Sequence, residues 1–157
     1  IQEGNSLVIY ALEKQFHVPI RLEEKKEELF LKGTVDRIDI LNGVTRVVDY
    51  KTGSVTAADL AFSDWEELIT DPKKSALFQA LLYTYALRSD FNGESVITGI
   101  IPLKNFNTSF LIASTNEIPR KRVPLKIDES SYAHFEQILF KLINEIFDPK
   151  KAFVQKI

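Results

Sequence analysis

The sequence predicts an α/β domain in which helices flank a central mixed β-sheet. Three observations indicate this fold class. The segments follow the order helix, three strands, one or two helices, two strands, helix. An Asn42-Gly43 pair separates two β-rich runs, which is a strong signal for a hairpin. Residues 74–88 and 128–147 place their apolar side chains at helical spacing.

The elements of the first half follow from their residue patterns. Apolar residues at helical spacing predict an amphipathic helix over residues 5–16, closed by Pro19. Residues 20–31 contain a charged run, EEKKEE, and their alternation predicts a strand with a solvated outer face. The two strands on either side of the Asn-Gly pair are expected over residues 33–41 and 45–51.

The second half predicts more helix than strand. The expected elements, in order, are a helix over 56–70, a helix over 74–88, strands over 95–103 and 108–114, and a helix over 128–147. The apolar stripe of the last helix predicts core packing rather than a functional site.

Length and composition limit the classes of protein. A chain of 157 residues predicts one domain, and because it begins with Ile1 we expect it to be part of a longer chain. The absence of cysteine excludes disulfides and cysteine-ligated zinc or iron–sulfur sites within this span. We expect a cytoplasmic protein, because the sequence has neither a long apolar run that would cross a membrane nor a signal pattern.

The net charge of −2 argues against a free-standing, high-affinity DNA-binding module, which would be basic. It does not argue against a nuclease, because a metal site needs local acids.

The strand over residues 45–51 has the most informative polar residues. Val47, Asp49 and Lys51 point to one face because side chains alternate along a strand. Both faces contain apolar residues, so we expect a central, covered strand in which an ionised Asp49 is costly. Two explanations are open. Asp49 pairs with Lys51, roughly 7 Å along the same face, or Asp49 binds a cation and Lys51 supports the chemistry.

The preceding strand favours the cation. It brings Asp36 and Asp39 to the neighbouring position across the hairpin, and several carboxylates near one lysine leave an excess of negative charge. Oxygen ligands of this kind suit Mg²⁺ or Mn²⁺. Such an ion activates water and stabilises charge on a phosphate. Lys51 would then hold or deprotonate the attacking water, or neutralise phosphate charge.

Three ordered motifs resemble the RecB-type branch of the PD-(D/E)XK nuclease superfamily, and are most similar to the C-terminal nuclease domains of AddB-like helicase–nuclease subunits. They are GTVDRID from Gly33, VVDYKTG from Val47 and QALLY from Gln79, and the resemblance covers about residues 5–150. It implies a restriction-endonuclease-like core. It also implies Asp36, Asp49 and the Tyr50 backbone carbonyl as metal ligands, Lys51 as the catalytic lysine, and Gln79 and Tyr83 on a helix beside the site.

The resemblance implies a Mg²⁺-dependent (or Mn²⁺-dependent), exonuclease-like deoxyribonuclease domain of a recombination or double-strand-break repair helicase–nuclease. Its implied partners are DNA and a helicase subunit. The alternative is a non-catalytic module of the same fold that binds DNA or protein within a larger complex. A plain structural domain with an Asp–Lys strand pair is a third interpretation.

Gln79 and Tyr83 also suit a site on chemical grounds. They lie four residues apart on one predicted helix, so they share a face. Their amide and hydroxyl groups are able to orient a carboxylate, a water or a phosphate. The alternative is that Tyr83 packs in the core and Gln79 is solvated.

Several polar residues have simpler explanations. A salt bridge or a hairpin-stabilising role is expected for Asp39 and Arg37. The family has a metal-ligating histidine on an upstream helix, but this sequence offers only His17, expected at the surface, and His134, expected to be structural. A basic cluster, Arg120-Lys121-Arg122 with Phe106 and Phe110 nearby in sequence, is either a phosphate contact or a solvated turn.

Overall fold

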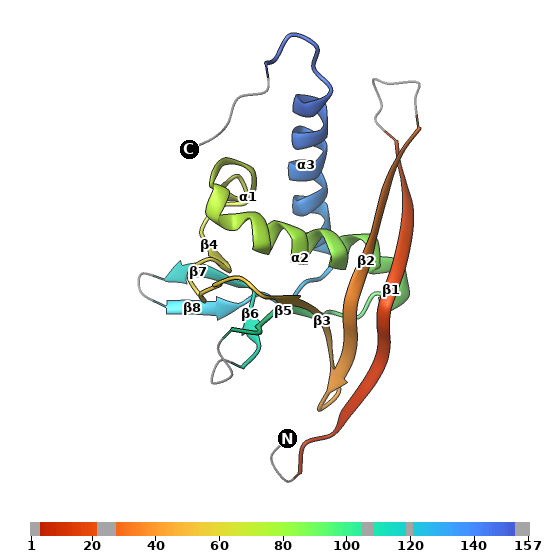
Figure 1. Cartoon of the computed structure of the whole chain (residues 1–157), viewed down its shortest axis with the longest axis vertical. Coiled ribbons are helices and arrows are strands. Elements are labelled where there is room, and N and C mark those ends of the chain that lie inside the picture. Colours follow the sequence, from red (N-terminus) through yellow and green to blue (C-terminus); the bar gives the residue numbers. More distant parts are fainter. Residues whose placement is uncertain (1–3, 22–27, 105–108, 119–120, 153–157) are drawn as a thin grey trace.

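The computed structural model describes residues 4–21, 28–104, 109–118 and 121–152 (Figure 1). Its larger sheet has five strands in the order β1-β2-β3-β5-β6, and a smaller sheet has three in the order β4-β7-β8. Neighbouring strands of the larger sheet run antiparallel except β3 and β5, which are parallel. The expected α/β class with a central mixed sheet is therefore confirmed.

The strands of the larger sheet are β1 (Leu7–Arg21), β2 (Glu28–Leu41), β3 (Val44–Lys51), β5 (Ile97–Pro102) and β6 (Leu111–Ile112). Those of the smaller sheet are β4 (Ala61–Phe62), β7 (Ser114–Ile118) and β8 (Lys121–Pro124). The helices are α1 (Glu67–Thr70), η1 (Pro72–Lys74), α2 (Ser75–Ala86), η2 (Arg88–Phe91) and α3 (Glu129–Ile146).

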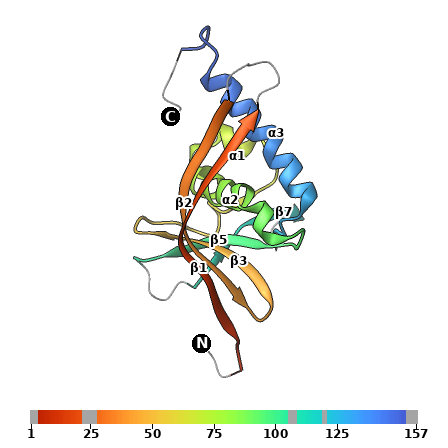
Figure 2. The same ribbon diagram turned by 90° about the vertical axis from the view of Figure 1, so that its right-hand side faces the viewer.

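The N-terminal segment is a strand, so the prediction of a helix over residues 5–16 is wrong. β1 pairs antiparallel with β2 along nearly its whole length, and the two form a long ribbon that extends beyond the other strands (Figures 1 and 2). In its second half Phe16 and Ile20 are buried, Val18 between them is partly buried, and the alternate residues are exposed, as expected for a strand. Pro19 lies inside β1 rather than after it. An edge strand tolerates proline because one side of its backbone needs no partner.

The hairpin between β2 and β3 is confirmed. Asn42 and Gly43 both have positive φ, 51° and 81°, as a type I′ turn requires. The Asn42 side chain also accepts a hydrogen bond from the Ser6 backbone N–H at 2.9 Å and donates one to Asn5 Oδ1 at 2.9 Å. The turn therefore also holds the start of β1 in place.

The helix predicted over residues 56–70 is mostly absent. Thr56 begins a turn instead, because its N–H and hydroxyl both donate to Asp59 Oδ2, at 2.8 and 2.7 Å. The chain then enters the smaller sheet at β4, whose two residues are buried, and only α1 is helical. The strand predicted over 108–114 is also divided, because β6 ends at Ile112 and Ser114 begins β7 in the other sheet.

The two principal helices are confirmed. α2 packs across β3 and β5, and α3 packs behind it through Phe135, whose ring lies 5.4 Å from that of Phe78 and 5.7 Å from that of Tyr85. α3 begins at Asp128, whose carboxylate accepts a hydrogen bond from the Ser131 N–H at 3.0 Å. In the described part of the chain, none of the helices has the length and apolar character needed to span a bilayer.

Gly33 provides the space in which the β1–β2 ribbon packs against α2. It pairs directly with Phe16 across the two strands, and a Cβ at Gly33 would lie 2.6 Å from Cζ of the Phe16 ring. That ring packs edge-on against Tyr83 of α2, with 5.9 Å between the ring centroids. The glycine therefore lets an aromatic ring fill the space between the ribbon and the helix.

Gly33→Ala should lower the free energy of unfolding by about 1–3 kcal/mol, because the added methyl group overpacks the Phe16 ring. Urea unfolding measures this change. Gly53→Ala is the matched control, since a Cβ there meets nothing within 4 Å, and it should change stability by less than about 0.5 kcal/mol. Equal effects of the two substitutions would show that Phe16 does not constrain Gly33.

Candidate functional site

The site lies where β2 and β3 separate. Their pairing runs from Leu41↔Val44 to Arg37↔Val48 and ends there, whereas β3 stays paired with β5 as far as Lys51. Beyond this end, Asp36 Oδ2 accepts a hydrogen bond from the Tyr50 N–H at 2.8 Å. A carboxylate thus replaces the main-chain carbonyl that a continued strand pair would offer. Asp36 and Asp49 therefore lie on adjacent strands at the fork, which is the place where β2 and β3 separate beyond the Arg37↔Val48 pair.

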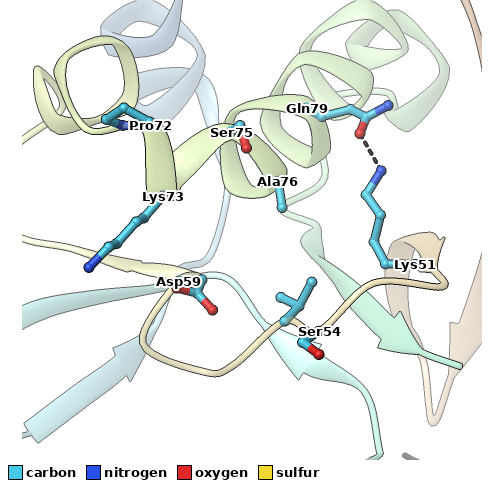
Figure 3. Close-up of a pocket in the computed structure, with 9 residues that line it drawn as sticks. Lys51, Ser54, Asp59, Pro72, Lys73, Ser75, Ala76 and Gln79 are labelled. Carbon is cyan, nitrogen blue, oxygen red and sulfur yellow. Dashed lines mark hydrogen bonds between the residues drawn. The ribbon is translucent and has the colours of Figure 1, made fainter. Parts of the chain in front are cut away.

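Lys51 connects the fork to α2. Lys51 extends from β3, and its ammonium lies 3.0 Å from Asp49 Oδ2 and also donates to Gln79 Oε1 on α2 (Figure 3). Gln79 Nε2 in turn donates to the Tyr83 hydroxyl at 2.6 Å. The alternative in which Gln79 is merely solvated is therefore wrong. Tyr83 both packs on Phe16 and fixes the Gln79 amide.

Asp49 is the most constrained acid of the group. It is only 4% exposed, and although Lys51 pairs with it, no well-aligned hydrogen bond reaches its Oδ2 atom from the described residues. Burial raises the pKa of Asp49, Lys51 opposes that shift, and nearby Asp36 adds to it. Lys51 pairs with Asp49, whereas the Asp36 carboxylate bonds the Tyr50 main chain, so the second acid near Asp49 has no lysine partner among the described residues.

Asp39 lies on the opposite face of the sheet and takes no part in this group. Arg46 binds it with two hydrogen bonds of 2.6 and 2.8 Å, and an Arg37 nitrogen lies 2.5 Å from it. Arg37 also donates to the Tyr50 hydroxyl at 3.1 Å. The expected salt bridge is confirmed, and it fixes the β2–β3 pair next to the fork.

Neither histidine contributes to the fork in the described structure. His17 is exposed on β1, where its ring lies 4.5 Å from that of Phe30. His134 is exposed on α3, stacks on Trp65 at 5.6 Å and contacts the Ser130 carbonyl through Nδ1 at 2.8 Å. Of the predicted basic cluster, Lys121 and Arg122 are exposed on β8, and Arg120 lies outside the described residues.

Glu13 is an acidic residue that the sequence reasoning missed. The pairs Leu12↔Arg37 and Lys14↔Val35 place it across from Asp36. Leu12, Glu13, Asp36 and Tyr50 line one open depression, and Glu13 has a positive φ of 48°, which is uncommon for this residue type. The predicted helix over residues 5–16 concealed this placement. The signal available in the sequence was the spacing of the apolar residues Phe16, Val18 and Ile20, which occupy every other position, as in a strand.

The donors at the fork fit a hard divalent cation. Mg²⁺ keeps several of its waters and is commonly held by one or two protein carboxylates, as Asp36 and Asp49 would provide. A complete protein cage is not present, because no three acidic or histidine side chains gather as a ready-made metal site among residues 4–21, 28–104, 109–118 and 121–152.

A family model, the PD-(D/E)XK nuclease superfamily, matches residues 2–156. The chain belongs to the PD-(D/E)XK nuclease superfamily. Membership indicates nuclease activity, and nucleases of this superfamily typically use divalent metals. No curated protein is a significant match. A solved structure titled "Crystal structure of SSO0001" is similar at 15% identity and a TM-score of 0.35, and the match covers 91% of this chain and 62% of that one.

Asp49→Asn should raise the melting temperature of the metal-free nuclease domain at neutral pH. The folded state raises the pKa of Asp49 above 3.8, so the fold disfavours its ionised form. That cost develops as pH rises through the interval between the unfolded and folded pKa values. The advantage of Asn should therefore vanish below pH 3.8. Thermal unfolding in a chelator across this pH range measures it.

The same variant should also lose the response to metal. At a Mg²⁺ concentration of about 100 times its Kd, the wild type should gain about 2.7 kcal/mol of stability, and Asp49→Asn should gain little. If Asp49→Asn is instead less stable than wild type at neutral pH, and Mg²⁺ stabilises both proteins equally, Asp49 is a structural residue.

Proposed function

We propose that this chain is a Mg²⁺- or Mn²⁺-dependent deoxyribonuclease, exonuclease-like, that hydrolyses phosphodiester bonds at the fork between β2 and β3. The observation that supports this most is that Asp36 of β2 lies next to Asp49 and Lys51 of β3 at the end of a strand pair. The buried Asp49 carboxylate, whose Oδ2 lacks a well-aligned hydrogen bond from the described residues, destabilises the fold, and a bound cation would compensate its charge.

The chemistry divides between the cation and the protein. Asp36 and Asp49 would hold the metal, with the Tyr50 backbone carbonyl as a third ligand. A bound divalent ion would polarise the phosphate and lower the pKa of its water. Glu13, across from Asp36, would add negative charge that favours a cation at this place.

Lys51 would act on the reacting groups directly. Asp49 and Gln79 hold its ammonium from two sides, one on the sheet and one on the helix. Held there, Lys51 would bind the attacking water or neutralise charge on the phosphate. Gln79 and Tyr83 act as positioning residues in this proposal. Because the Tyr83 hydroxyl accepts from Gln79 Nε2, the Gln79 oxygen is the atom that faces Lys51.

The biological setting proposed is a RecB/AddB-like helicase–nuclease of recombination or double-strand-break repair, in the cytoplasm. The three ordered motifs support it, and they imply DNA and a helicase subunit as partners. Residues 1–157 would form one domain of that longer assembly.

A non-catalytic module within a larger complex is the second candidate. Two observations favour it, namely the acidic pI of about 5.8 and the lack of a third acidic or histidine ligand among the described residues. Metal titration separates the two candidates, because only a working carboxylate site should raise the melting temperature with Mg²⁺ or Mn²⁺.

Asp49→Ala and Lys51→Ala should each lower the rate of Mg²⁺-dependent DNA cleavage by at least about 100-fold, since each removes a group at the reacting phosphate. Release of fragments from end-labelled single-stranded and duplex DNA measures the rate. Glu94→Ala, an exposed acid away from the fork, is the control and should cleave at the wild-type rate. Full activity in both site variants would refute the mechanism.

Glu13→Gln should weaken Mn²⁺ binding by about tenfold, as expected when a charged group near a metal is neutralised. The substitution keeps the size of the side chain and removes only its charge. Titration calorimetry gives the Kd, with Glu28→Gln, an exposed acid at the start of β2, as the control. An unchanged Kd in Glu13→Gln would mean that the fork binds metal without help from β1.

A further inference from the structure

A cavity of about 440 Å³ opens between the start of α2 and the loop that follows β3. Lys51 and Gln79 form one end of it, and Lys73 and Asp59 lie at the other end (Figure 3). The cavity therefore begins at the proposed catalytic lysine and leads away from it. Every residue that lines it lies in the described part of the chain.

The wall between the two ends has a mixed character. It is formed by the apolar side chains of Val55, Pro72 and Ala76 and by the hydroxyl-bearing residues Ser54 and Ser75. An apolar surface with a few polar groups is typical of sites that bind small organic groups, and the volume is within the range of such sites.

The cavity is more basic than the chain as a whole. Lys73 is exposed and makes no ion pair with any of the described residues. Buried Lys74 lies behind it and donates to the carbonyls of Ala58 and Ala61, at 2.9 and 2.6 Å. The acid among the lining residues is Asp59, whose Oδ2 is occupied by Thr56. Two lysines and one aspartate line the cavity, so its lining is positive although Lys51 is paired with Asp49 beside it, whereas the net charge of the chain is −2.

The walls are held in place before any ligand binds. The Lys74 ammonium joins the end of η1, directly before α2, to the loop at the Ala58 carbonyl and to β4 at the Ala61 carbonyl. The Thr56–Asp59 hydrogen bonds close the loop on itself. A ligand that enters this cavity would therefore pay little for ordering the loop.

We propose that this cavity binds the nucleotide next to the scissile phosphodiester of single-stranded DNA, and that Lys73 contacts its phosphate. The proposal rests on the proposed nuclease function. Two cations, Lys51 and Lys73, separated by a wall of apolar and hydroxyl-bearing residues match the order phosphate, sugar, phosphate along one strand. The space is that of a small-ligand site, so it admits one strand and excludes a base-paired duplex.

Binding in a chelator tests the proposal without cleavage. A fluorescent oligothymidylate is titrated with wild type, Lys73→Gln and Lys73→Arg over a series of salt concentrations. Each phosphate contact contributes about 0.7 to the slope of log K against log salt for a single strand. Lys73→Gln should bind more weakly, with a slope about 0.7 shallower. Lys73→Arg should restore both values, and a hairpin duplex should compete poorly.

Two further variants complete the test. Lys150→Gln removes the same charge from an exposed lysine outside the cavity, and its slope should be that of wild type. Ser54→Glu adds a negative charge to the cavity wall and should weaken binding, which tests the same cavity if Lys73→Gln fails to fold. The proposal is overturned if Lys73→Gln and Ser54→Glu both bind with the slope and affinity of wild type. It is also overturned if the duplex competes better than single-stranded DNA does.

The two proposals fail in different ways. If wild type cleaves DNA and Asp49→Ala does not, but Lys73→Gln binds like wild type, only the proposed path of the strand is wrong. If wild type neither binds nor cleaves DNA with Mg²⁺ or Mn²⁺, the nuclease function itself is wrong.

Discussion

The end of the β2–β3 pairing at Arg37↔Val48 is the constraint on which the site depends. At that point the strands diverge, and the Tyr50 N–H is bonded by the Asp36 carboxylate instead of a carbonyl. One interaction thus closes the strand pair and fixes an acid beside a second acid, Asp49. On the other face, the Arg37–Asp39–Arg46 group supports the last paired residues, so the divergence occurs at a defined place.

The proposed reactive lysine is shared between two layers of the fold. Lys51 belongs to a central strand, but its ammonium is held by Asp49 on the same strand and by Gln79 on α2. Its position is therefore correct only while the helix is docked on the sheet. The same helix begins at the cavity that contains Lys73, so α2 organises both the proposed chemistry and the proposed path of the strand.

Sequence reasoning succeeded where local signals and long-range packing agree. The Asn-Gly turn requires positive φ at both residues, and the apolar stripes of α2 and α3 are long, so these elements and the fold class were predictable. Contacts connect Asp49, Lys51, Gln79 and Tyr83 in that order, and Asp36 bonds the main chain at Tyr50, next to Asp49. Their roles in catalysis stay predictions.

The failures have a common physical cause, which is pairing between distant segments. Residues 5–16 have apolar residues at a spacing compatible with a helix, and only the partner β2 makes them a strand. β7 and β8 were not expected because the smaller sheet is built from strands of only two, five and four residues, in which few positions display the alternation. Glu13 was missed for the same reason, because its position follows from strand register and not from any motif.

The contact between Gly33, Phe16 and Tyr83 has a consequence for comparing sequences of this kind. Gly33 and Tyr83 belong to different motifs, and the residue that joins them, Phe16, belongs to neither. A sequence search that scores motif residues alone does not detect Phe16. Across related chains, a larger residue in place of the glycine should accompany a smaller one at the position of Phe16. Such paired substitutions would reveal the register of β1 even where its own sequence suggests a helix.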